Sequence, residues 1–123
     1  LRFIGEVDHH QASDIAAALA RSAGPALDIA LSGVGTFGRR GHVDTLWAGL
    51  TPHDGLAALR RKVDRACVAA GIAPDDRAYL PHITLARLNR SSARVDDFLS
   101  LQAGLSSPTF TVNEFGLYES LMG

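Results

Sequence analysis

The hydrophobic and polar positions along the chain change their spacing several times, and these changes divide the 123 residues into elements. Runs rich in β-branched and aromatic residues predict strands, whereas apolar residues three to four positions apart predict helices. Strands are expected at residues 1–7, 26–38, 42–50, 79–88 and 108–120. Helices are expected at residues 11–23, at 52–70 and after the serines at 91 and 92.

The second helix has the clearest boundaries. Thr51 is suited to the cap, Pro52 to the first helical position and Asp54 to the position three after the cap, while Gly71 ends the helix. One apolar stripe follows at helical spacing: Leu56, Leu59, Val63, Ala66, Cys67 and Ala70. The resulting order, β-α-β-β-α-β-α-β, leaves neighbouring strands too close for crossover helices. It therefore predicts an α+β fold with a mainly antiparallel sheet.

Composition narrows the classes of function. The chain has 12 basic and 13 acidic residues and a formal net charge of -1. This balance argues against a protein that coats long nucleic acid, but it permits a local basic site for one nucleic-acid end. No apolar run reaches the roughly 18 to 20 residues that cross a bilayer. The length predicts a single domain over residues 1–123, and the single cysteine, Cys67, favours a reducing cytoplasm.

The segment "PHITLARL" at residues 81–88 carries the candidate chemistry. Side chains of a strand alternate between its two faces, so His82 and Thr84 are expected on one face, with Ile83 and Leu85 in the core. The imidazole can take or give a proton near neutral pH, and the hydroxyl can donate to a bound anion. One such pair is a weak site. Two pairs facing each other would suit metal-free cleavage of a phosphodiester.

"PHITLAR", together with "FTVNEFGLYES" and the opening "LRFIGEV", resembles the 2H phosphoesterase superfamily. Within it the chain is most similar to the RNA 2′,3′-cyclic phosphodiesterases, long labelled 2′-5′ RNA ligases. The resemblance implies a bilobal α+β fold in which two mainly antiparallel sheets frame a groove, with helices outside. It also implies two His-x-Thr-x motifs, of which the chain holds the second and only the last residue, Leu1, of the first.

A faint internal repeat agrees with this interpretation. Residues 1–5 and 85–89 each lead from an apolar strand through a polar turn into a helix. If Leu1 corresponds to Leu85, a His-x-Thr is expected before Leu1. The domain is accordingly expected to lack its N-terminal segment.

The resemblance also assigns roles to residues. It implies that His82 is catalytic, that Thr84 binds the phosphate, and that Arg87 helps to hold it. Simple alternation places Arg87 opposite His82, unless the strand bulges or the side chain wraps around the strand end. Tyr79 and Phe37 could stack on a base, although packing is the alternative for both. The resemblance implies no metal and no cofactor.

The expected reaction is hydrolysis of a terminal RNA 2′,3′-cyclic phosphate to a 2′-phosphate, with weak 2′-5′ ligation as a further activity. The expected partners are RNA 3′ ends that carry the cyclic phosphate, with tRNA fragments among them, and the expected state is a monomer. One alternative substrate class is cyclic nucleotides or ADP-ribose cyclic phosphate. Another alternative is a module that binds RNA ends without catalysis.

Two other patterns favour simple structure over chemistry. "DHH" at residues 8–10 has metal-binding residue types, but no second cluster accompanies it, so a polar turn before the first helix is favoured. The glycines at 33, 35 and 38 match the dinucleotide-binding fingerprint, which requires a helix directly after it. A strand is expected there instead, so the segment is interpreted as a hairpin.

The remaining polar and aromatic positions are interpreted as follows. Arg39, Arg40 and His42 form a small basic tip that could steer an RNA phosphate. Residues 60–62, "RRK", are expected on the solvated side of the second helix, and Trp47 in the core.

Overall fold

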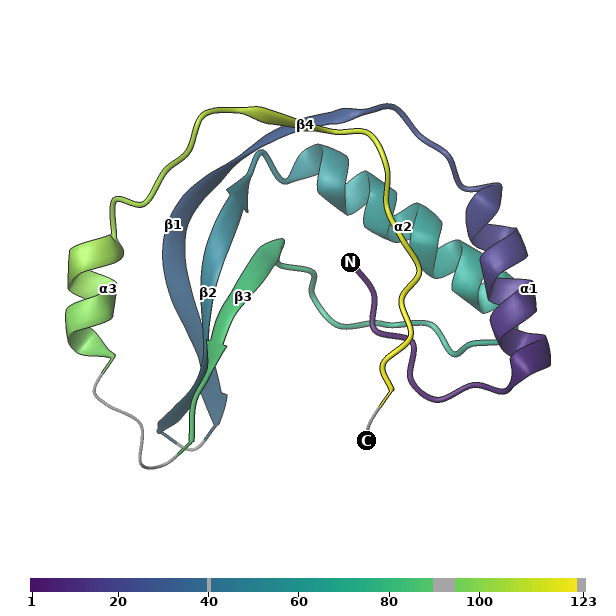
Figure 1. Ribbon diagram of the computed structural model, residues 1–123, viewed down its shortest axis with the longest axis horizontal. Coiled ribbons are helices and arrows are strands. Elements are labelled where there is room, and N and C mark those ends of the chain that lie inside the picture. Colours follow the sequence, from purple (N-terminus) through teal and green to yellow (C-terminus); the bar gives the residue numbers. More distant parts are fainter. Residues whose placement is uncertain (40, 90–94, 122–123) are drawn as a thin grey trace. The chain divides into compact units, whose positions relative to one another are not determined.

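The computed structural model describes residues 1–39, 41–89 and 95–121 (Figure 1). Its elements, in chain order, are α1 (His9–Ala20), β1 (Leu27–Arg39), β2 (His42–Thr51), α2 (Asp54–Ala69), β3 (His82–Arg87), α3 (Asp96–Gln102) and β4 (Phe110–Val112). These elements confirm the α+β class. They fall into two compact units: a helical unit of residues 1–27, 54–79 and 112–123, and a sheet unit of residues 28–53 and 80–111.

The sheet unit contains one four-stranded sheet with the order β3-β2-β1-β4. β1 and β2 form the predicted antiparallel hairpin, and β3 pairs antiparallel with β2 on its other side (Figure 1). An antiparallel bridge between Ser32 and Ser106 joins β1 to the chain that leads into β4. β3 is therefore an edge strand of this sheet within the described residues.

The strands expected at the two ends of the chain differ from the structure. Residues 1–7 form no strand, and of residues 108–120 only Phe110–Val112 do, so the described residues hold one sheet where two were expected. An apolar pattern yields a strand only where a partner satisfies the backbone groups. Ile4 and Val7 instead pack against the helical core.

The helical unit is built around contacts between α1 and α2. Its buried cluster consists of Ile15, Ala18, Leu19, Val63, Ala66 and Cys67. The α2 members lie on the predicted apolar stripe. Cys67 is fully buried, as its place on the apolar stripe predicted, and its burial raises the pKa of the thiol.

The helix starts show where local signals were misleading. α2 begins at Asp54, not at Pro52, because β2 continues to Thr51, which pairs with Ala30. The expected threonine cap is therefore wrong. α1 begins at His9, where the side chain of Asp8 accepts a hydrogen bond from the Gln11 N–H at 2.8 Å. Asp8 thus caps α1, and His9 and His10, which were expected in a polar turn, are the first residues of the helix.

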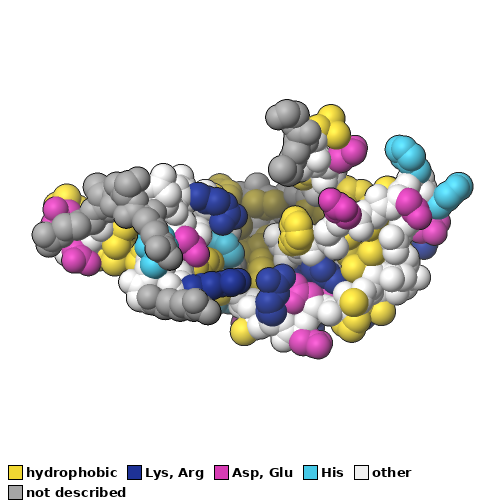
Figure 2. Space-filling view, turned by 90° about the horizontal axis from the view of Figure 1, so that it is seen from below, with side chains coloured by type: hydrophobic (Ala, Val, Ile, Leu, Met, Phe, Trp, Pro, Cys, Tyr) yellow, Lys and Arg dark blue, Asp and Glu magenta, His cyan; other side chains and the backbone are white. Residues whose placement is uncertain are grey.

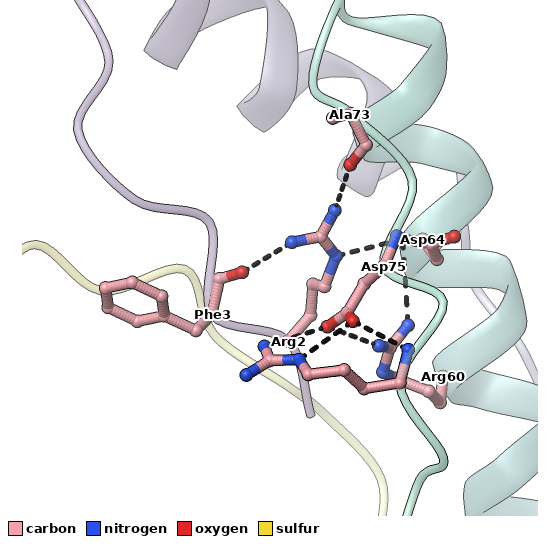
Figure 3. Close-up of polar contacts among 7 residues, drawn as sticks. Arg2, Phe3, Arg60, Asp64, Ala73 and Asp75 are labelled. Carbon is pink, nitrogen blue, oxygen red and sulfur yellow. Dashed lines mark hydrogen bonds and ion pairs between the residues drawn. The ribbon is translucent and has the colours of Figure 1, made fainter.

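A buried ion network ties α2 to the chain that follows it (Figure 3). Arg60, expected on the solvated side of the helix, is only 8% exposed. Its guanidinium lies 2.8 Å from Asp75 and 3.7 Å from Asp64, and it sits 5.7 Å from the centre of the Tyr79 ring. Arg60 was expected in solvent, but Asp64 on α2 and Asp75 after α2 pair with its guanidinium. These ion pairs offset the cost of burying the charge.

Arg2 completes this network from the N-terminal end of the chain. Its Nε donates to Asp64 at 2.9 Å, and its terminal nitrogens donate to the carbonyls of Ala73 and Phe3 (Figure 3). Arg2 thereby links residues 1–7 to α2 and to the segment after it, all within the helical unit.

Acidic, basic and hydrophobic side chains are interspersed on the face seen in Figure 2, in keeping with the balanced charge of the sequence. None of the helices in the described ranges is both long and apolar enough to cross a membrane.

The network predicts a stability effect at Asp64. Asp64→Ala removes the carboxylate that Arg2 and Arg60 share, so it should lower the free energy of unfolding by about 2–4 kcal/mol. Asp76→Ala is the matched control, since Asp76 is exposed and should change it by less than about 0.5 kcal/mol. Urea denaturation measures both. Equal stability of the two variants would contradict the account.

Candidate functional site

The register between β2 and β3 determines which side chains of β3 share a face. Trp47 lies opposite Thr84, and Thr45 lies opposite Arg87. One residue thus lies between the two partners on β2, whereas two residues lie between the two partners on β3. Leu85 is the extra residue, so β3 contains a bulge.

The bulge reverses the alternation after Thr84. Residues directly opposite each other in a sheet point to the same side, and Thr45, Trp47 and Gly49 share one side of β2. Their partners Arg87, Thr84 and His82 therefore share one face, which we call the His82 face. Simple alternation had placed Arg87 on the other face. Of the two options open for this residue, the bulge is the one found.

The opposite face of β3 is less buried than expected. Ile83 lies on the side of the buried Ala48, yet Ile83 is 45% exposed, and Leu85 at the bulge is 51% exposed. Their expected place in the core is therefore wrong for the described residues. β3 is an edge strand, and within the described sheet it pairs with β2 along one edge only.

The backbone before β3 orients the imidazole of His82. Its Nδ1 lies 2.7 Å from the carbonyl oxygen of Leu80. A carbonyl oxygen can only accept, so Nδ1 carries the hydrogen of this bond. In the neutral ring, Nε2 is then the unprotonated nitrogen. This tautomer leaves Nε2 available to accept a proton from another molecule.

Two aromatic rings pack around this imidazole. The ring of Phe37 meets it edge-to-face at a centroid distance of 5.0 Å, and that of Trp47 lies 6.1 Å away. Phe37 and Trp47 also contact each other at 5.4 Å. Trp47 was expected in the core, but it is only partly buried and lies on the His82 face. Trp47 lies two residues from both Thr45 and Gly49 on β2, and this spacing could have placed it on the His82 face.

The other predicted site residues are placed as follows. Tyr79 belongs to the helical unit, where its ring faces Arg60 and its burial raises the pKa of the phenol. At the hairpin tip Arg39 pairs with His42, while Arg40 lies outside the described residues, as do Ser91 and Ser92.

The glycine-rich segment at 33–38 lies inside β1, and β2 follows it. The structure thus confirms the hairpin and not a dinucleotide-binding turn, because the helix that this motif needs is absent from that position.

Comparison with known families identifies the superfamily of the chain. A model of the 2′-5′ RNA ligase superfamily matches residues 2–122. The chain belongs to this superfamily. The match spans both units and includes the whole His82 face. It confirms the family that the motif at residues 81–88 indicated.

Two relatives carry the same name. The RNA 2′,3′-cyclic phosphodiesterase of Geobacillus stearothermophilus is 33% identical over 124 residues, which covers 99% of this chain and 40% of the relative. The enzyme of that name from Aeropyrum pernix is 36% identical over 89 residues, covering 72% of this chain and 51% of the relative. The chain therefore spans about half the length of these relatives or less.

A solved structure shares the fold. The crystal structure of the protein TT0787 of Thermus thermophilus superposes with a TM-score of 0.66 at 22% identity, covering 89% of this chain and 61% of that one. At this identity the likeness supports the fold alone.

The bulge predicts where an arginine can serve the His82 face. Arg87→Ala should weaken binding of a nucleoside 2′-monophosphate about tenfold or more, because a charged hydrogen-bond donor is lost. Adding Ala86→Arg to this variant should not restore binding, since residue 86 lies opposite Leu46 on the other face. Isothermal titration calorimetry measures both. Recovery in the double variant would mean that the strand alternates regularly in solution.

Proposed function

We propose that the protein hydrolyses terminal RNA 2′,3′-cyclic phosphates to 2′-phosphates, with His82 as one of two imidazoles in acid–base catalysis. The observation that carries the proposal is the His82 face, on which an imidazole, a hydroxyl and a guanidinium stand together on one edge strand. Membership of the superfamily and the names of the two relatives support the substrate class.

The chemistry of the proposed step requires two proton transfers. One imidazole takes a proton from water as its oxygen attacks the phosphorus. The other imidazole gives a proton to the 3′ oxygen as the P–O3′ bond breaks, which leaves a 2′-phosphate. His82 is suited to either role through Nε2, since its Nδ1 is engaged by Leu80. We place the second imidazole in the His-x-Thr expected before Leu1.

Thr84 and Arg87 are proposed to bind the phosphoryl oxygens. Charge builds on these oxygens in the transition state, and a fixed hydroxyl and a guanidinium stabilise it by hydrogen bonds and opposite charge. Both side chains are exposed, so an approaching phosphate can reach them. Phe37, at the border of the same face and 38% exposed, is proposed to contact the terminal base.

RNA 3′ ends with a cyclic phosphate, tRNA fragments among them, are the proposed partners. A monomeric state and a cytoplasmic location belong to the same proposal. Weak 2′-5′ ligation would use the same residues, with the 5′-hydroxyl of a second RNA in place of water as the group that attacks the phosphorus while the P–O3′ bond breaks.

The decisive variant is His82→Ala in the complete protein. It should lower hydrolysis of an RNA oligomer that ends in a 2′,3′-cyclic phosphate by roughly 100- to 10,000-fold, because the acid–base group is lost. The midpoint of thermal unfolding should stay close to that of the parent, since His82 is exposed. The control is His53→Ala, another exposed histidine, which should keep full activity.

Two further arms of this assay separate the alternatives. Activity that persists in EDTA supports the two-imidazole mechanism, whereas loss with EDTA and rescue by a divalent ion would replace it with a metal mechanism. Faster turnover of cyclic nucleotides or of ADP-ribose cyclic phosphate than of the oligomer would change the substrate class. Binding of the oligomer without turnover would indicate a module that binds RNA ends without catalysis.

A further inference from the structure

The indole of Trp47 lies against the backbone of Gly35 on the neighbouring strand. Gly35 and Trp47 are partners in the β1–β2 register, and a Cβ added at Gly35 would overlap Cζ2 of Trp47. No side chain can occupy that position while the indole stays where it is. The absence of a side chain at Gly35 therefore allows the indole to lie close to β1.

We propose that Trp47, seated on Gly35, is a positioning residue for His82. The inference rests on the proposed function, because it gives His82 a catalytic role, and it assigns Trp47 and Gly35 the task of fixing the direction of Nε2.

Contacts on several sides of the imidazole support this role. The Leu80 carbonyl fixes the Nδ1 edge, Phe37 meets the ring at 87°, and Trp47 packs beside it at an interplanar angle of 57°. His82 is exposed and lies at the start of an edge strand, where few other groups restrict its rotation. A proton-transfer group that is free to rotate loses most of the benefit of orientation. The two rings supply the restriction that the strand does not.

The indole nitrogen provides a second, independent observation. Nε1 of Trp47 is buried and has no hydrogen-bond partner among the described residues. An unpaired buried donor is unfavourable, and a phenylalanine in the same place would avoid that cost. The presence of an indole here in spite of this cost is explained if the size of the ring is needed. The larger ring reaches from Gly35 to the imidazole.

The first experiment uses Trp47→Phe. It should lower kcat for the cyclic-phosphate oligomer by about tenfold or more and leave KM within about threefold, because orientation and not binding is lost. Replacing Trp47 by the isostere benzothienylalanine, which keeps the ring size but lacks the N–H, should restore kcat. An unchanged kcat in Trp47→Phe would overturn the proposal. So would an isostere as slow as phenylalanine, since the N–H would then be the active feature.

Gly35→Ala tests the same role without changing the indole. The added methyl should displace Trp47 and lower kcat in the same way. Gly104→Ala is the matched control, because a Cβ at Gly104 meets nothing within 4 Å. Gly35→Ala with the kcat of the control would contradict the proposal.

A spectroscopic readout tests the contact without turnover and on the folded parent protein. Trp47 is the one tryptophan of the chain, and a protonated imidazole in contact with an indole quenches its fluorescence. Emission should therefore fall when acidification protonates the imidazole that the indole contacts. The fall should disappear in His82→Gln and persist in His42→Gln.

The two readouts distinguish two kinds of failure. A pH-dependent emission that survives His82→Gln would show that the indole does not contact His82, and it would overturn the positioning role even if the protein is an active phosphodiesterase. Emission that depends on His82 in a protein that turns over no cyclic phosphate would instead overturn the proposed function on which the role rests.

Discussion

The pairing of β3 with β2 is the constraint on which the candidate site depends. One extra residue, Leu85, shifts the pairing between Thr84 and Arg87, so three polar side chains with different chemistry share a face. In a regular strand the guanidinium and the imidazole would lie on opposite faces. Bulges are found near active sites because they redirect a side chain in this way. The bulge therefore connects backbone hydrogen bonding to the chemistry proposed for the site.

Local patterns predicted much of the fold, and they failed where tertiary partners decided the outcome. The β1–β2 hairpin and the apolar stripe of α2 follow from spacing alone, and both were found. The threonine cap was overridden because β2 extends to Thr51. The pattern of residues 1–7 is that of a strand, but Ile4 and Val7 pack on helices instead. A sequence pattern specifies an apolar face, whereas the structure specifies what covers it.

The site residues also differ in whether local sequence patterns could predict their positions. His82 and Thr84 could be placed on one face from the period of a strand, and their roles rest on the motif. The position of Arg87 could not be predicted, because a bulge leaves no local signal in "HITLAR". Trp47 and Arg60 were misplaced for a related reason. Their partners, Gly35 and Phe37 for the one and Asp75 for the other, are distant in sequence and come close only through pairing and packing.

The orientation of the His82 ring is the central claim, and nitrogen NMR of the imidazole tests it most directly. In ¹⁵N-histidine-labelled protein, the account predicts that neutral His82 carries its hydrogen on Nδ1. It also predicts that the Nε2 signal shifts when a nucleoside 2′-monophosphate is added. A neutral ring with its hydrogen on Nε2, or an Nε2 signal that does not shift when the nucleoside 2′-monophosphate is added, would contradict the account.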